Sequence, residues 1–386
     1  MLLALHKLFP KAPLYTSIYD RKKTPWADAF DPSAGSAQGV KTSFVQNLPF
    51  ATKHELYAVL MPIAFESFSF DEYDLVISVT SEAAKGIITK PNTMHICYCL
   101  TPTRYLWSGY KEYFRNPFFS FFSKPAVSYL RSWDKVSAQR PDAYVAISKE
   151  VQRRIKRYYG RESIVVYPPL GISNNHSLLN RHSGERSDSR ISFPKSLGRT
   201  ERFWTSQNDD KKQNKGYFLI VSRLVPYKRI DIAIRAFNKL KLPLKIVGSG
   251  SEDKKLRSIA NSNIEFLGYL TERELVRYYK DCRALIFPGI EDFGLTALEA
   301  QSFGKPVIAF RGGGALETII EGKTGEFFYP QNEEALIEKV KDFRSSKYDP
   351  MDCIKNAERF SFERFKREFM RVVKYENSKH QIPNSK

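Results

Sequence analysis

The chain has 386 residues, of which 42% are apolar and 27% charged, and this balance excludes global disorder and favours two domains over one. Lysine and arginine outnumber aspartate and glutamate by 61 to 42, so the net charge is +19. Such an excess indicates a polyanionic partner: nucleic acid, an anionic membrane surface or a phosphorylated small molecule.

No apolar run is as long as a transmembrane helix, and no secretory signal peptide is recognisable. The four cysteines form neither a disulfide framework nor a four-ligand zinc pattern. We therefore expect a cytoplasmic protein.

The first half of the chain begins with an amphipathic segment, residues 1–8, which predicts a short helix that ends before Pro10. Short apolar runs then alternate with helical segments, of which residues 149–159, capped by Ser148, are the clearest. Buried strands separated by helices indicate a parallel sheet covered on both faces. The predicted strands of this half are residues 13–19, 73–79, 93–100, 142–147 and 163–167.

A polar segment rich in Ser, Asn, Arg and Lys interrupts this alternation and divides the chain. A stretch of this length without strand or helix patterns predicts a linker or a mobile insertion. We expect a Rossmann-like domain over residues 1–172, a basic polar linker over 173–215, and a second domain over 216–362. Residues 363–386 predict a basic helix and tail, for which packing against the N-terminal domain is one option.

The second half repeats the alternation and predicts a doubly wound domain, in which ligands collect beyond the carboxyl ends of the strands. Its predicted strands are residues 216–222, 244–247, 264–267, 284–287 and 307–310. Its predicted helices are residues 230–240, 272–279, 295–303 and 316–320.

Two glutamates follow the fourth strand of this half. Glu291 lies in the loop, and Glu299 lies inside the helix that begins near Gly294. The start of a helix presents unpaired N–H groups and a positive dipole end, which favour a phosphate. A carboxylate accepts hydrogen bonds from hydroxyl groups, so the two glutamates suit a sugar and a ribose. The alternative is a surface acid and a helix acid in salt bridges.

Basic and glycine residues follow the other strands. Arg223 and Lys228 come directly after the first strand, where a guanidinium fork and an ammonium group suit phosphate oxygens. Two solvated loop cations are the alternative. Gly248 and Gly250 allow a close backbone approach but lack the third glycine of a dinucleotide fingerprint. Three further glycines at 312–314 form a turn after the last predicted strand.

Together, these segments resemble the donor domain of a retaining GT-B glycosyltransferase of family GT4, glycosyl transferase group 1. The resemblance covers about residues 216–330 and implies an α/β fold of the GT-B type, with two Rossmann-like doubly wound domains and an interdomain cleft. The matching residues are Ser222, Arg223, Leu224, Lys228, Gly248, Gly250, Glu291, Glu299, the glycines at 312–314 and Glu317.

The resemblance also implies roles for these residues. Arg223 and Lys228 would hold the diphosphate, Glu291 would bind the hydroxyl groups of the donor sugar, and these three form the predicted catalytic group. The other predicted donor-binding residues are Glu299 at the ribose, Gly294, Leu295 and Thr296 at the phosphate or sugar, Gly248 and Gly250, and Tyr269 and Leu270 beside the base. The family needs no metal, so we expect no cofactor besides the donor itself, GDP-mannose or a UDP-sugar.

The N-terminal half resembles the acceptor domain of a GT4 subgroup that transfers mannose to polysaccharides and O-antigens. The matching segments are residues 12–19, 95–107 and 142–148. The family's first strand and its Gly-Gly-x-Glu turn are not found, so we expect this domain to lack its first strand. Leu100 stands where several relatives carry a histidine. Arg104 and His95 are the acceptor-side candidates, with a satisfied core histidine as the alternative for His95.

An aromatic and basic segment, residues 110–135, favours docking on an anionic membrane surface. The alternative is that its phenylalanines pack in the core of a helical hairpin. Cys97 and Cys99 have the spacing of one strand face and predict two core thiols rather than a metal site.

The resemblance thus implies a retaining hexosyltransferase that moves a hexose, with mannose as the first choice, to a glycan or lipid-linked acceptor in cell-surface polysaccharide synthesis. We expect it in the cytoplasm, on the inner face of the membrane. The alternative is a non-catalytic sugar-nucleotide-binding or scaffold protein, because the first strand and its glycine turn are missing. A nucleic-acid partner is not expected, since no recognition motif accompanies the positive charge.

Overall fold

The computed structural model describes residues 1–21, 24–30, 39–49, 57–114, 117–171 and 216–380, so the whole of the predicted linker, residues 173–215, lies outside the described residues. The chain forms two compact units. The first unit consists of Met1–Pro169 and Phe360–Lys386, and the second of Leu170–Arg359.

The second unit is built on a parallel sheet with the strand order β12-β11-β10-β7-β8-β9. The chain starts at β7 and moves outward through β8 and β9, and then moves from β10 in the opposite direction. This is the Rossmann order, and it places the topological switch point between β7 and β10. The strands are β7 (Phe218–Val221), β8 (Leu244–Val247), β9 (Ile264–Gly268), β10 (Ala284–Phe287), β11 (Val307–Phe310) and β12 (Gly325–Phe328).

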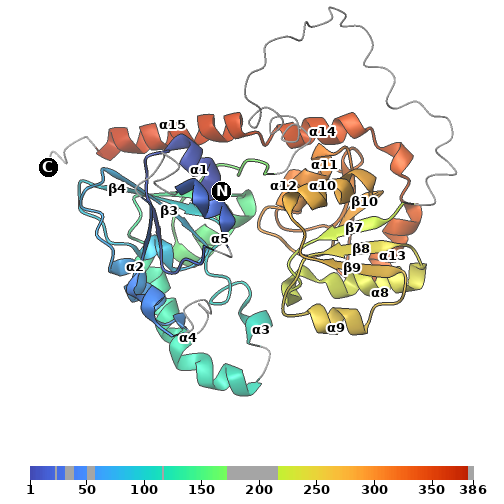
Figure 1. Ribbon diagram of the computed structural model, residues 1–386, viewed down its shortest axis with the longest axis horizontal. Helices are drawn as coiled ribbons and strands as arrows, with labels where there is room; N and C mark the ends of the chain where they lie inside the picture. Colours follow the sequence, from blue (N-terminus) through green and yellow to red (C-terminus); the bar gives the residue numbers. More distant parts are fainter. Residues whose placement is uncertain (22–23, 31–38, 50–56, 115–116, 172–215, 381–386) are drawn as a thin grey trace, which may run out of the picture. The chain divides into compact units, whose positions relative to one another are not determined.

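Helices cover both faces of this sheet (Figure 1). One face packs on α8 (Ile230–Leu240), α9 (Asp253–Ser258) and α13 (Glu333–Asp342). The other face packs on α10 (Glu272–Asp281), α11 (Leu295–Ser302) and α12 (Ala315–Thr318), and α14 (Pro350–Glu358) lies against α11. Both faces of the strands are therefore buried, which explains why the strands are short apolar runs without alternation.

The first unit contains a parallel sheet with the order β3-β4-β5-β6 and a separate parallel pair, β1 and β2. All residues of β4 are buried. The strands are β1 (Leu14–Thr16), β2 (Val40–Thr42), β3 (Leu75–Thr80), β4 (Met94–Cys99), β5 (Ala143–Ala146) and β6 (Ile164–Val165).

The last helix of the chain belongs to the first unit and lies against β4 (Figure 1). The rings of Phe365 and Phe369 lie 6.1 and 6.0 Å from the ring of Tyr98. The helices of this unit are α1 (Leu2–Leu8), α2 (Met61–Glu66), α3 (Tyr110–Tyr113), α4 (Pro117–Ser137), α5 (Lys149–Tyr159) and α15 (Phe362–His380). Short 3-10 helices are Pro25–Phe30, Phe44–Asn47, Ala83–Gly86, Pro226–Lys228 and Ser345–Lys347.

The predicted α/β class with parallel sheets is confirmed in both units. Among the described helices, none combines the length and the apolar character needed to cross a bilayer.

Candidate functional site

The switch point of the second unit brings together two oppositely charged side chains that are far apart in the sequence. Lys228 follows β7 and Glu291 follows β10, and the Lys228 ammonium donates a hydrogen bond to Glu291 Oε1. The two side chains are only 12% and 19% exposed. A Cβ atom on Gly289 would lie 2.8 Å from Lys228 Cα, so only glycine allows the two loops to approach this closely. The structure therefore joins two of the three predicted catalytic residues.

Arg223 is connected to this pair through an aromatic side chain. Its guanidinium donates a hydrogen bond of 2.7 Å to the Tyr227 hydroxyl, and the Lys228 ammonium lies 5.2 Å from the Tyr227 ring centre. Arg223 is exposed, so its remaining N–H groups can meet a ligand. The loop after β7 thus presents two cations at one edge of the sheet.

The start of α11 lies directly after Glu291 and completes this edge. Gly294 caps the helix with φ at 99°, a conformation that favours glycine, and a Cβ there would lie 3.3 Å from both Phe287 Cζ and Thr318 Oγ1. The N–H groups of Leu295 and Thr296 are in the first turn, where a helix offers donors without intrahelical acceptors. Together with the helix dipole, they favour an anion.

Glu299 lies one turn further along α11 and is held by α10. The Tyr279 hydroxyl donates a hydrogen bond of 2.7 Å to Glu299 Oε2. The pKa of Glu299 is raised to about 7, mainly by burial; the Tyr279 hydrogen bond opposes the rise, and the negative charge of Glu272 adds to it. A carboxyl group that titrates near neutral pH is typical of functional sites.

The two glycines after β8 are required by close contacts with another loop of the same chain. Gly248 has φ at 130°, and a Cβ there would lie 1.9 Å from the Ser222 carbonyl oxygen. A Cβ on Gly250 would lie 2.3 Å from the Leu224 carbonyl oxygen, and Leu224 N–H donates to Ser249 at 2.9 Å. These glycines let the loops after β7 and β8 pack on each other, which helps to position Arg223, and their donor-binding role stays a prediction.

The glycine turn at 312–314 supports the loop that carries Glu291. Gly314 N–H donates to the Glu291 carbonyl oxygen at 2.8 Å, and a Cβ on Gly314 would lie 2.3 Å from Phe293 Cα.

Below this loop lies a buried amide cluster that sequence reasoning missed. Asn356 of α14 donates to Gln301 Oε1 at 2.6 Å and to the Thr318 carbonyl at 2.8 Å, which ties α14 to α11 and α12.

The two residues predicted beside the base differ in exposure. Tyr269 follows β9 and is 81% exposed. Leu270 is partly buried and packs against the part of the core to which α10 contributes. An exposed aromatic ring at the carboxyl end of a strand is available for stacking on a planar ligand.

The first unit separates the two acceptor-side candidates. His95 is fully buried in β4, where its Nε2 lies 2.8 Å from the Ser78 hydroxyl. The pKa of His95 is lowered to about 3, mainly by burial and to a smaller extent by the nearby charge of Arg161. A fully buried ring cannot contact an acceptor, so the acceptor-side prediction for His95 is wrong. The ring lies in the core, but it is only partly satisfied, because its Nδ1 has no hydrogen-bond partner among the described residues. Cys97 and Cys99 are likewise buried free thiols.

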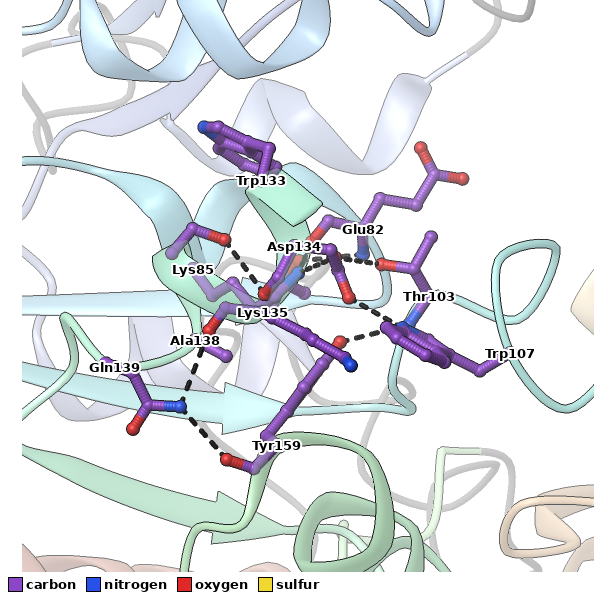
Figure 2. A network of polar contacts seen from close by, with 12 residues as sticks. Glu82, Lys85, Thr103, Trp107, Trp133, Asp134, Lys135, Ala138, Gln139 and Tyr159 are labelled. Atoms are coloured by element: carbon purple, nitrogen blue, oxygen red, sulfur yellow. Dashed lines mark hydrogen bonds and ion pairs between the residues drawn. The ribbon is translucent and has the colours of Figure 1, made fainter. Parts of the chain in front are cut away.

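Arg104 lies half-buried in the turn after β4, and this turn is anchored by an aspartate of α4 (Figure 2). Asp134 Oδ1 accepts from Thr103 Oγ1 at 2.8 Å, and Asp134 Oδ2 accepts from Trp107 Nε1 at 2.7 Å. The Lys85 ammonium forms an ion pair with Asp134, and both side chains are at most 2% exposed. The pattern of residues 110–135 did not predict this buried anchor.

The fold of the second unit indicates the class of protein. A parallel doubly wound sheet with this strand order is the architecture of many nucleotide-binding domains. Residues 203–360, which lie almost wholly in the second unit, match the family model for glycosyl transferases group 1.

The solved structure of Anabaena HepE in complex with UDP is similar over 97% of this chain and 95% of that chain, with a TM-score of 0.61 and 17% sequence identity. The sucrose-phosphate synthase structure from Thermosynechococcus elongatus gives a TM-score of 0.62 over 95% of this chain and 98% of that chain, at 14% identity. These similarities confirm the GT-B fold.

Relatives by sequence include a probable sucrose-phosphate synthase of Thermosipho melanesiensis, 25% identical over 97% of this chain and 88% of the relative. The O-antigen chain mannosyltransferase C of Escherichia coli is 27% identical over 55% of this chain and 52% of the relative. An uncharacterized glycosyltransferase of Methanocaldococcus jannaschii is 35% identical over 32% of this chain. That alignment spans about a third of the relative, 36% of its length.

Proposed function

We propose that this protein is a retaining hexosyltransferase that works without a metal ion. It takes a hexose, with mannose as the first choice, from a nucleotide-diphospho-sugar. The Lys228–Glu291 pair at the switch point is the observation that carries the proposal, since it combines a phosphate-binding cation with a carboxylate that accepts sugar hydroxyl groups. The names of the mannosyltransferases among its relatives favour mannose, and the UDP complex of HepE keeps a UDP-sugar as the second choice.

Each group of the site has one task in this proposal. Lys228, Arg223 and the first N–H groups of α11 neutralise the diphosphate as the nucleotide leaves. Glu291 orients the sugar through its hydroxyl groups, and Glu299 accepts from the ribose. The bond from the anomeric carbon to the diphosphate oxygen breaks, and a bond to the acceptor oxygen forms on the same face of the sugar. The proton of the acceptor hydroxyl leaves with the diphosphate.

The acceptor of the proposed reaction is a glycan or a lipid-linked molecule at the cytoplasmic face of a membrane. The start of α4 supports this location, because Phe118, Phe121 and Phe122 are 73%, 65% and 64% exposed. The hairpin-core alternative is wrong for these three side chains. Next to them lies a hollow of about 340 Å³ lined by cations and aromatic rings. Its lining includes Lys124, Arg131, Lys135, Trp107 and Tyr110.

Such a surface fits an anionic bilayer, since phenylalanines enter the headgroup region and cations meet lipid phosphates. Sedimentation with phosphatidylglycerol vesicles should carry the protein down, whereas phosphatidylcholine vesicles should leave it in solution. Replacing Phe118, Phe121 and Phe122 by serine should abolish binding. Equal binding of this variant would contradict the membrane proposal.

The transfer itself is tested with GDP-mannose and UDP-glucose, a lipid extract as acceptor, and EDTA in a parallel reaction. We expect nucleotide release to depend on the acceptor, to persist in EDTA and to yield the α-anomer from an α-linked donor, as read by NMR. Lys228→Ala should remove turnover, and Lys239→Ala, a lysine on exposed helix surface paired with Glu333, should not. Full turnover of Lys228→Ala would end the proposal.

A further inference from the structure

One polar contact in the second unit holds the carboxyl group that is proposed to bind the ribose. The Tyr279 hydroxyl of α10 donates a hydrogen bond of 2.7 Å to Glu299 Oε2 of α11. Among the residues that the structure describes, no cation forms an ion pair with Glu299, and no other group donates to its carboxylate. A carboxylate offers about four acceptor positions on its two oxygens, so Glu299 can accept further hydrogen bonds at Oε1.

The position of the Tyr279 hydroxyl is fixed by packing. The side chain is fully buried, and its ring stacks on the ring of Phe303, with the ring centres 5.7 Å apart and the planes at 11°. Phe303 caps the carboxyl end of α11, the helix that carries Glu299. The helix α10 in turn begins with a capping box formed by Thr271 and Glu274. This packing holds the hydroxyl oxygen at one place beside Glu299.

The proton of this contact belongs to the tyrosine. Burial raises the pKa of Tyr279 well above its usual value, and the negative charge of Glu299 adds to the rise. Tyr279 therefore keeps its proton across the neutral range and donates it to the carboxylate. The hydrogen bond favours the ionised form of Glu299, whereas burial and the charge of Glu272 favour the protonated form. The ionised form accepts at both oxygens, as a ligand with hydroxyl groups requires.

We propose that Tyr279 is a positioning residue for recognition of the ribose of the nucleotide. By holding Oε2 of Glu299, it orients the carboxylate so that Oε1 accepts from a ribose hydroxyl group. The buried Tyr279 side chain does not touch the nucleotide and acts through Glu299. The inference rests on the proposed function, in which Glu299 accepts from the ribose. It adds that discrimination between ribose and a sugar without these hydroxyl groups depends on α10 as well as on α11.

The opposing explanation is that Tyr279 only packs in the core. Its ring belongs to the apolar cluster on this face of the sheet, together with Leu275 and Phe303. Tyr279→Phe keeps the ring and its stacking on Phe303 and removes the hydroxyl alone, so this variant separates the two explanations. Loss of a packing contact would change stability, whereas loss of a positioning contact would change the preference for ribose.

The test is calorimetric titration of the 386-residue chain with UDP, GDP and the 2′,3′-dideoxy form of each. The ratio of the two dissociation constants for one base gives the preference for ribose. Tyr217→Phe is the matched control, because it removes a tyrosine hydroxyl of the same unit that donates to the Tyr278 carbonyl at 3.0 Å. Each protein is titrated at about pH 6 and about pH 8, on either side of the Glu299 pKa of about 7.

At the higher pH we expect the wild type to bind the ribose form about 10- to 150-fold more tightly than the dideoxy form, as for hydrogen bonds to a charged group. Tyr279→Phe should lower this preference by about 2- to 12-fold, the cost of ordering one side chain that is no longer held, and should leave the affinity for the dideoxy form unchanged. The pH at which the preference appears should rise, because removing the hydroxyl raises the pKa of Glu299. Tyr217→Phe should match the wild type in both measurements.

An equal preference for ribose in Tyr279→Phe and the wild type would overturn the inference. An equal loss of affinity for the ribose and dideoxy forms would also overturn it, because the change would then be one of packing. A wild type without any preference for ribose would overturn it too, but the donor site would stand if Lys228→Ala still weakens binding. Binding of none of the nucleotides would instead contradict the proposed function, and the inference would fall with it.

Discussion

The titration of Glu299 gives a quantitative prediction for the stability of the second unit. Burial raises the pKa of its carboxyl group to about 7 from the usual 4.5. The folded protein therefore binds the proton more tightly than the unfolded chain does between these values. Stability is full at low pH and falls as the pH rises through this window, because the unfolded chain ionises first.

The size of the effect follows from the two pKa values. Between about pH 5.5 and about pH 8.5, linkage through this one group lowers the free energy of unfolding by about 2 kcal/mol. Glu299→Gln removes the titration while its carbonyl oxygen still accepts from Tyr279. Raising the pH across this range should therefore increase the free energy of unfolding of the variant, relative to that of the wild type, by about 2 kcal/mol.

Hydrogen exchange of the core amides of β10 in the full chain measures the free energy of unfolding of the second unit. Glu338→Gln, which changes an exposed glutamate of the same unit, is the matched control and should follow the wild type. If the free energies of unfolding of Glu299→Gln and the wild type differ by the same amount at both pH values, burial does not raise the pKa of the Glu299 carboxyl group.

Two further substitutions test the packing that positions the site residues. Asp134→Asn should lose about 3–5 kcal/mol of unfolding free energy in urea, because Lys85 is left buried without its partner. Adding Lys85→Met should cost less than the two single changes summed, and simple additivity would refute the coupling. Gly248→Ala should lower the melting temperature more than Gly160→Ala does, since both residues have positive φ but only Gly248 has a carbonyl oxygen at 1.9 Å from the added Cβ. Equal shifts would refute the proposed loop contact.

Sequence patterns predicted the elements whose signals are local. The bounds of α5 and α8 follow from amphipathic periodicity, and Ser148 caps α5 by accepting from Val151 N–H at 3.0 Å, as its residue type favours. Strand β12 was not predicted, because Gly325 and Glu326 break its apolar run, and only pairing with β11 makes it a strand.

The site was predictable in its parts but not in its geometry. Order along the chain indicates that Lys228 and Glu291 both follow strands, yet their contact depends on β7 and β10 being neighbours at the switch point. His95 was a candidate because it lies near Leu100, where relatives carry a histidine, and three-dimensional packing shows that it is buried. The role of Asp134 depends on Lys85, Thr103 and Trp107, which meet only in the folded unit.

The most direct test of the donor site is calorimetric titration of the 386-residue chain with GDP, UDP, GDP-mannose and UDP-glucose. We predict one site that binds one of the two nucleotide families. Lys228→Ala should weaken this binding by about 10- to 150-fold, the loss expected for a hydrogen bond to a charged group, and Lys239→Ala should leave it unchanged. An absence of binding by all four ligands, or equal affinity in Lys228→Ala, would contradict a nucleotide-sugar site at the switch point of β7 and β10.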